Sequence, residues 1–239
     1  MELAPSLHRI GSDMVNVYLI DEPGGITVVD AGIPGLWKEL IAELESMDRS
    51  VEDIRGVVLT HADTDHLGFA ERLRKEHDVP VYVHEADALQ ARGETQKKNP
   101  PWGKVKVGPT LSFLWYAARR GGLKVTPVAE VQTVSDGEVL DLPGSPRILH
   151  TPGHSPGSIA IHSELASALF VGDAMTTRHV LTGARGPQPA PFTLDTDMAM
   201  TSLRRWSGVD ARWVVPGHGY PWDGGVAEAV ARIEAAAAG

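Results

Sequence analysis

Two imidazoles and two carboxylates lie within six residues of one another near the end of the first quarter of the chain. His61, Asp63, Asp65 and His66 follow the apolar stretch 56–59, which predicts a short buried strand. Imidazole nitrogen and carboxylate oxygen at a strand end are donors that a divalent metal ion takes in proteins. The stretch therefore indicates a metal site.

Three more residues of the same chemical type occupy similar local settings further along the chain. His154 lies in a turn rich in Gly and Pro, Asp173 follows a predicted strand over 168–171, and His218 follows a predicted strand over 213–215. Ligand sites commonly form in loops at strand ends, so we expect all seven residues at one edge of the sheets. Seven such donors can serve two adjacent ions, and the pattern predicts a two-metal hydrolytic site.

The elements that must position these residues alternate between strands and helices. Strands are predicted at 14–20, 25–29, 56–59, 81–84, 131–133, 139–142, 147–150, 158–162, 168–171 and 213–215. Helices are predicted at 36–47, 67–77, 85–91, 196–206 and 226–237. Two strand-rich stretches, each interleaved with helices, predict two sheets packed face to face with helices outside, in a single domain over residues 1–239.

Composition excludes several classes of site and partner. The 239 residues include no cysteine, so disulfides, zinc–thiolate sites, iron–sulfur clusters and thiol nucleophiles are absent, and a metal must be held by His and carboxylates. The net charge of -9 argues against binding to nucleic acid. The N-terminal residues do not resemble a signal peptide and no apolar run is long enough to span a membrane. We therefore expect a cytoplasmic protein.

A basic and partly aromatic segment stands out against this acidic background. Between Lys97 and Lys124 there are seven Lys or Arg residues and no Asp or Glu, and the apolar side chains around Trp115 predict a helix. We interpret residues 92–127 as a helical insertion that resembles a lid. It could pack onto the domain, cover the metal cleft and shape an apolar pocket, or form the face of a homodimer. Contact with a membrane is disfavoured because anionic lipids repel an acidic protein.

The ligand-type residues and their order resemble those of the metallo-β-lactamase superfamily, in particular its glyoxalase II-like and lactonase-like hydrolases. That family has the pattern His-x-His-x-Asp-His, then a distant His, a bridging Asp and a final His, and the sequence 28–32 is similar to its first-strand signature. The resemblance covers most of the chain. It implies an α+β fold, an αββα sandwich of two mixed β-sheets flanked by helices, with a dinuclear metal centre.

The same resemblance implies a role for each residue. It assigns a first metal to His61, Asp63 and His154, a second to Asp65, His66 and His218, the bridging position to Asp173 and a supporting position to Asp30. It also implies a metal-bridging hydroxide that attacks a small ester, lactone or thioester, oriented by Asp65 as the catalytic residue. Residues that bind the substrate are not assigned, because nothing in the loops selects one substrate.

Asp63 departs from the family pattern, because most hydrolytic members have His at this position. We expect two divalent ions, with zinc as the first choice and iron or manganese as alternatives that the harder carboxylate oxygen favours. Two other functions stay open beside hydrolysis. One is a di-iron oxidoreductase or oxygen-reacting protein, and the other is a non-catalytic metal-binding module on the same fold.

Overall fold

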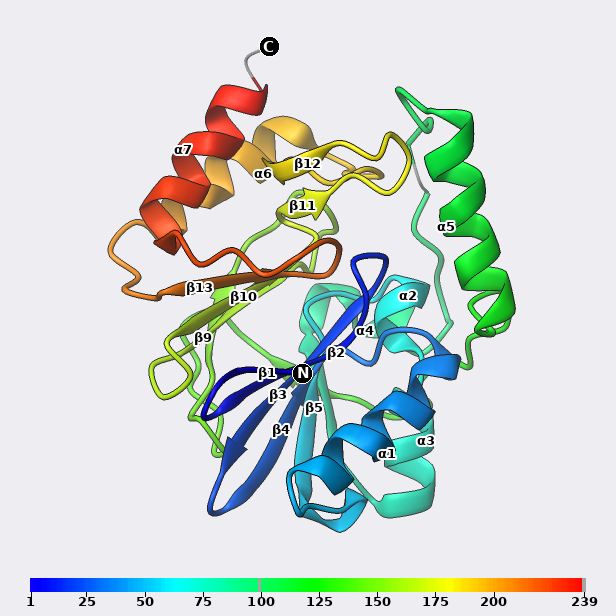
Figure 1. Ribbon diagram of the computed structural model, residues 1–239, viewed down its shortest axis with the longest axis vertical. Helices are drawn as coiled ribbons and strands as arrows, with labels where there is room; N and C mark the ends of the chain where they lie inside the picture. The colour runs from blue at the N-terminus through cyan, green and yellow to red at the C-terminus, as the bar shows by residue number, and fades with distance from the viewer. Residues whose placement is uncertain (99, 238–239) are drawn as a thin grey trace.

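A computed structural model describes residues 1–98 and 100–237 of the chain. Two β-sheets stack face to face and helices cover their outer sides, which confirms the predicted αββα sandwich (Figure 1). The single domain over 1–239 stays a prediction, and residue 99 of the predicted insertion and residues 238–239 lie outside the described residues.

The first sheet is mixed and follows the chain order from β1 to β7. Its strands are β1 (Glu2–Ala4), β2 (Leu7–Gly11), β3 (Asn16–Glu22), β4 (Gly25–Val29), β5 (Ile54–Val58), β6 (Val81–His84) and β7 (Gln132–Val134). The first four strands pair antiparallel, and β4 to β7 pair in parallel. All of β4 is buried, which explains its nearly continuous apolar sequence, since both faces of the sheet are covered.

The second sheet has the order β13-β10-β9-β8, and a separate pair of strands lies beside it. Its strands are β8 (Arg147–His150), β9 (Ile159–Ser163), β10 (Ala168–Gly172) and β13 (Trp213–Pro216), and the separate pair is β11 (Thr176–Arg178) and β12 (Arg185–Gln188). Strands β10 and β13 run parallel, so their carboxyl ends meet at one edge. Asp173 and His218 follow these two ends.

Seven α-helices and four short 3-10 helices complete the described fold of residues 1–98 and 100–237. The α-helices are α1 (Trp37–Ser46), α2 (Thr64–Leu67), α3 (Ala70–His77), α4 (Ala88–Ala91), α5 (Val107–Arg119), α6 (Thr196–Ser202) and α7 (Gly225–Ala237). The 3-10 helices are η1 (Pro34–Leu36), η2 (Val51–Asp53), η3 (Glu85–Asp87) and η4 (Leu203–Trp206). Helices α1 and α3 cover the first sheet, and α6 and α7 cover the second (Figure 1).

Alternation of side chains along the strands divides the core into three layers. Val28 and Val57 of the first sheet pack with α1 and α3, whereas the neighbouring Val29 and Val58 pack with Phe170 of the second sheet. On the far side, the second sheet packs with α7 in a third cluster. Apolar side chains therefore cover both faces of each sheet.

The predicted helix over 67–77 is interrupted in the structure. Helix α2 ends at Leu67 and α3 begins at Ala70. The amides of Gly68 and Phe69 donate to the carbonyls of Gly32 and Ala31, at 2.9 and 3.2 Å. A Cβ on residue 68 would lie 2.4 Å from the carbonyl oxygens of both Ala31 and Gly32, so only glycine allows this close approach.

The predicted strand over 139–142 is wrong. Val139 makes only an isolated bridge to Arg147, and the amide of Leu140 donates to the carbonyl of Pro146 at 3.0 Å, within a tight reversal of the chain. Four short strands, β1, β2, β11 and β12, were not predicted. The other predicted elements are present, with ends that differ by a few residues.

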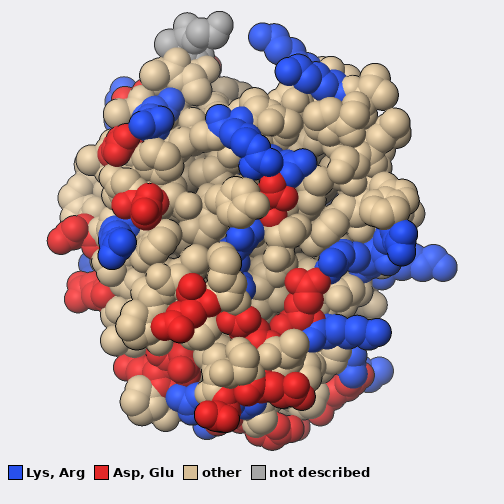
Figure 2. Space-filling view, viewed as in Figure 1, with Lys and Arg blue, Asp and Glu red and all other residues tan. Residues whose placement is uncertain are grey.

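Helix α5 lies inside the segment 92–127, as predicted, and stands at one side of the molecule (Figure 1). All of its side chains are at least partly exposed, and its Trp115 is 62% exposed. Acidic side chains gather on the lower half of the face in Figure 2, and basic side chains lie beside α5. In residues 1–98 and 100–237, no helix has the length and apolar character to cross a membrane.

Candidate metal centre

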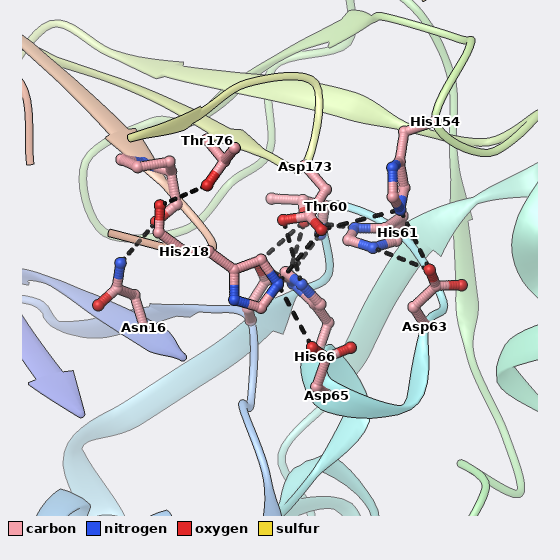
Figure 3. A network of polar contacts seen from close by, with 12 residues as sticks. Asn16, Thr60, His61, Asp63, Asp65, His66, His154, Asp173, Thr176 and His218 are labelled. Carbon is pink, nitrogen blue, oxygen red and sulfur yellow. Dashed lines mark hydrogen bonds and ion pairs between the residues drawn. The ribbon is translucent and has the colours of Figure 1, made fainter. Parts of the chain in front are cut away.

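All seven predicted ligand residues come together at the edge where strands of both sheets end (Figure 3). Each is carried by the segment that follows a strand or by the short helix beside it. His61 and Asp63 follow β5, Asp65 and His66 belong to α2, His154 lies between β8 and β9, Asp173 follows β10, and His218 follows β13. Their role as metal ligands stays a prediction at this point, but their placement matches it.

His61, Asp63 and His154 form one set of converging donors, which we call the first group. Asp63 Oδ2 lies 3.6 Å from His61 Nε2 and 3.1 Å from His154 Nε2. Both imidazoles are buried, whereas the Asp63 side chain is 20% exposed. The set has two nitrogen donors and one carboxylate.

Asp65, His66 and His218 form the second group. His218 Nε2 lies 3.3 Å from Asp65 Oδ2 and 3.3 Å from Asp173 Oδ2. Asp173 also lies 3.6 Å from His66 Nε2 and 3.8 Å from His154 Nε2, through different oxygens. Asp173 is therefore within reach of both groups, as the predicted bridging position requires.

Three buried donor atoms of the site have no hydrogen-bond partner among the described residues. They are His61 Nε2, His66 Nε2 and Asp173 Oδ1, and the three side chains are close enough to hold one ion. An unpaired buried polar atom costs about 1–3 kcal/mol, so native proteins rarely keep one without a partner. The donor set fits a divalent cation, which would satisfy all three atoms.

Asp30 holds two residues of the site in place, Thr60 and His66. Its Oδ1 accepts a hydrogen bond from the Thr60 amide at 2.7 Å, and its Oδ2 accepts one from His66 Nδ1 at 2.7 Å. The Thr60 hydroxyl lies within hydrogen-bond distance of both oxygens, at 3.0 Å from Oδ1 and 2.9 Å from Oδ2. Its backbone has a φ of 60°, in the left-handed region that a non-glycine residue seldom adopts. The strained residue thus directs its carboxylate to the ring of His66, leaving Nε2 free to face the site.

The other three imidazoles are also held through Nδ1. His61 contacts the Thr60 hydroxyl at 3.1 Å, His154 contacts the Thr193 hydroxyl at 3.3 Å, and His218 donates to the carbonyl of Met14. Each Nε2 therefore points into the site. This is how proteins fix the orientation of histidines that bind metals.

Burial and close charges perturb the pKa values of the second group and Asp173. Burial favours the neutral carboxyl of Asp173, but the close imidazoles of His218 and His66 outweigh it and hold its pKa well below the usual range. Burial likewise opposes ionisation of Asp65, and contacts with His218 and His66 lower its pKa.

The pKa values of the two imidazoles of the second group are raised. Burial alone would lower the pKa of His218, but Asp173 and Asp65 raise it to about 10. Asp30 and Asp173 similarly raise the pKa of His66 well above its usual value despite burial. In the first group, burial lowers the pKa of His154, against a raising effect of Asp63. The centre is an anionic cluster that stabilises positive charge, most strongly at the second group.

A cavity of about 550 Å³ opens onto this centre. Asp63, Asp65, Asp173 and His218 contribute polar atoms to its wall. Apolar side chains form other parts of the wall, among them Ile33, Phe113, Val125, Val180 and Phe192. Phe113 belongs to α5, so the predicted insertion does contribute to the wall of the cavity.

Three residues of the site were not predicted from the sequence. Gln90 Nε2 donates to Asp63 Oδ1 at 3.0 Å, and Lys97 Nζ lies 2.7 Å from Asp63 Oδ2. Asp87 is buried and accepts from the Ala62 amide, the Ser155 hydroxyl and the Gly157 amide, at 3.1, 2.6 and 2.8 Å. Asp87 thus ties together the two loops that carry the first group. No local sequence signal distinguishes Lys97 from the other basic residues around it.

Comparisons with known proteins agree with the fold. The sequence model of a family described as "Metallo-beta-lactamase superfamily" matches residues 10–218. The chain is 28% identical over 236 residues to the probable metallo-hydrolase YflN of Bacillus subtilis (strain 168). This alignment covers 93% of this chain and 87% of that protein. The predicted family is therefore confirmed.

Two solved structures extend the comparison. TTHA1623 in a di-iron-bound form is 27% identical, with a TM-score of 0.62 over 91% of this chain and 93% of that one. The metallo-β-lactamase family protein TTHA1429 from Thermus thermophilus is 23% identical, with a TM-score of 0.69 over 98% of this chain and 81% of that one, and shows the same fold.

Proposed function

This chain belongs to the metallo-β-lactamase superfamily, and from that premise we propose that it is a metal-dependent hydrolase that cleaves a small ester, lactone or thioester. Similarity to a probable metallo-hydrolase and the converging His and Asp groups support metal-dependent hydrolysis in general. The observation that carries the proposal is the set of three unpartnered buried donors of the described site, His61 Nε2, His66 Nε2 and Asp173 Oδ1, beside an open cavity.

The first and second groups, with Asp173 between them, offer positions for up to two divalent ions. Zinc suits both groups, and the carboxylate-rich set also suits iron or manganese. A divalent ion held there would polarise an acyl carbonyl and lower the pKa of water from ~15.7 to about 7.

Asp65 is the residue best placed to handle the proton of the attacking water. Its side chain is 24% exposed and lines the cavity, while His218 Nε2 lies 3.3 Å from Oδ2. Because its pKa is lowered, Asp65 stays ionised at neutral pH and can accept a hydrogen bond from water. In the reaction, the hydroxyl of water joins the acyl carbon, the carbon–oxygen or carbon–sulfur bond breaks, and the proton passes to the leaving oxygen or sulfur.

The shape of the cavity supports a small substrate. A volume of about 550 Å³ holds a small molecule, and the apolar wall formed by Phe113, Val180 and Phe192 suits an acyl or lactone chain. Helix α5 acts in this proposal as one side of a lid, through Phe113. The net charge of -9 favours small molecules over nucleic acid.

The test is hydrolysis of a panel of esters, lactones and thioesters before and after removal of metal by a chelator. We expect activity toward at least one class to disappear with the metal and return when zinc, manganese or iron(II) is added back. Asp65→Asn should lower kcat by about 10²–10⁴-fold, the usual contribution of a general base. Full hydrolysis by the chelated protein would overturn the proposal.

A di-iron redox function is the second candidate, because Asp63 adds a carboxylate and TTHA1623 binds two irons on a similar chain. It predicts consumption of oxygen by iron-loaded protein with an electron donor, and no dependence of hydrolysis on the same iron. Zinc-loaded protein that hydrolyses substrate and consumes no oxygen would exclude it.

A further inference from the structure

The ammonium group of Lys97 lies among the donor atoms of the first group. Nζ is 2.7 Å from Asp63 Oδ2 and 2.9 Å from His154 Nε2. The side chain is only 3% exposed, although neighbouring Lys98 is exposed. A buried lysine needs an anionic partner, and Asp63 provides it.

The position of Lys97 also explains why a carboxylate at residue 63 suits this chain. Gln90 Nε2 holds Oδ1 of Asp63 at 3.0 Å, and Lys97 and His154 contact Oδ2. An imidazole at this position would carry no negative charge to neutralise the ammonium group. Asp63 and Lys97 therefore form a pair, 34 residues apart in the chain.

The second group has a different environment. Within residues 1–98 and 100–237, the carboxylates of Asp65 and Asp173 lie within ion-pair distance of histidines only, and not of a Lys or Arg. His66 Nε2 and Asp173 Oδ1 have no hydrogen-bond partner in that part of the chain. No ammonium or guanidinium group of these residues therefore faces the carboxylates of the second group and Asp173, whereas Asp63 and His154 of the first group already face a cation.

We propose that Lys97 is a tethered cation that competes with a metal ion for the first group. An ammonium and a metal ion cannot share the same two donor atoms, because both are positive and both need the same lone pairs. The two positions therefore fill unequally. The second group with Asp173 takes an ion first, and the first group takes one only when the Lys97 side chain withdraws. This inference rests on the metal binding in the proposed function, but not on the identity of the substrate.

The experiment is a titration of zinc, and separately manganese, into chelator-treated protein by calorimetry. The variants are Lys97→Met, Lys97→Gln and, as a matched control, Lys98→Met at the neighbouring exposed lysine. We expect the wild type to bind one ion tightly and a second at least about tenfold more weakly, within the 10–100-fold range that contacts around a metal site produce. Lys97→Met should tighten the second event by a similar factor and leave the first unchanged.

Lys97→Gln keeps a hydrogen-bonding group but loses the charge, so it should behave like Lys97→Met, and Lys98→Met should behave like the wild type. Thermal unfolding of each variant without metal shows that it is folded. Two ions that bind the wild type with equal affinity, or a second event that neither Lys97 variant tightens, would overturn the inference. A wild type that binds no ion would overturn the proposed function itself, so the two failures are distinguishable.

Discussion

The two groups of the metal centre have similar donors but different surroundings. In the second group, Asp30 holds His66 at 2.7 Å, the Met14 carbonyl holds His218, and the Nε2 atom of His66 is unpartnered among the described residues. In the first group, Thr193 holds His154 at 3.3 Å, and Lys97 contacts both Asp63 and His154. In our proposal, ligand type alone would therefore not set metal affinity in this centre. The partners behind and between the ligands would decide which position fills first.

The largest contrast should come from removing one histidine of each group. His66→Ala should abolish tight metal binding and reduce hydrolysis to the background rate, because the second group then has only one imidazole left. His154→Ala should retain one tightly bound ion. Elemental analysis of the purified variants measures both, with His162→Ala on strand β9 as a control. Loss of the tight ion in His154→Ala, with retention in His66→Ala, would reverse our assignment.

The orienting contacts provide the next contrast. Asp30→Asn should weaken binding at the second group by about 10–100-fold, because the charged partner of His66 is lost. Thr193→Val should have a smaller effect, since its contact with His154 is neutral and longer. A competition titration against a coloured chelator measures both affinities. Equal effects of the two substitutions would show that the support of the two groups does not differ.

Asp63→His addresses the first group directly. It removes the carboxylate partner of Lys97 and adds an imidazole donor, so the affinity of the first group for zinc should rise by about tenfold, in the range that neighbouring groups exert on metal sites. Manganese should gain less than zinc, because it prefers oxygen donors. The measurement is the affinity of the weaker binding event for each metal. An unchanged or lower zinc affinity of the weaker binding event would contradict the competition between Lys97 and metal.

The weakest effect on the metal centre should come from Asp87, which links the loops carrying the first group. Asp87→Asn should lower the free energy of unfolding by about 1–3 kcal/mol, because buried donors lose a charged acceptor. It should weaken the first group by a few-fold and leave the second group unchanged. Asp136→Asn, at an exposed carboxylate, serves as the control in chemical denaturation. A larger loss of affinity at the second group than at the first would show that Asp87 acts on the whole fold.

Much of this site could be predicted from the sequence, because most of the ligand-type residues come shortly after apolar runs that form the largely buried strands β5, β10 and β13. Asp173 after β10 and His218 after β13 meet simply because these strands pair in parallel. The family resemblance then supplied the order of the ligands. The role of Asp30 was also predicted, and the structure places its carboxylate against His66.

What the sequence did not reveal depends on contacts between distant segments. Lys97 was only one of seven basic residues, and its pairing with Asp63 exists only because the segment after α4 returns to the end of β5. The break between α2 and α3 has the same origin, since the amide of Gly68 donates to Gly32 rather than to its own helix. The strand predicted over 139–142 failed because a tight turn, held by Leu140 and Pro146, replaced the sheet ladder.

Unequal filling of the metal centre can be observed by anomalous X-ray diffraction from crystals of the wild-type protein grown with one equivalent of zinc. We expect a single strong anomalous peak between Asp65, His66 and His218, beside Asp173, with the Lys97 ammonium still between Asp63 and His154. Two peaks of equal height, or a single peak within the first group, would show that Lys97 does not decide which position fills.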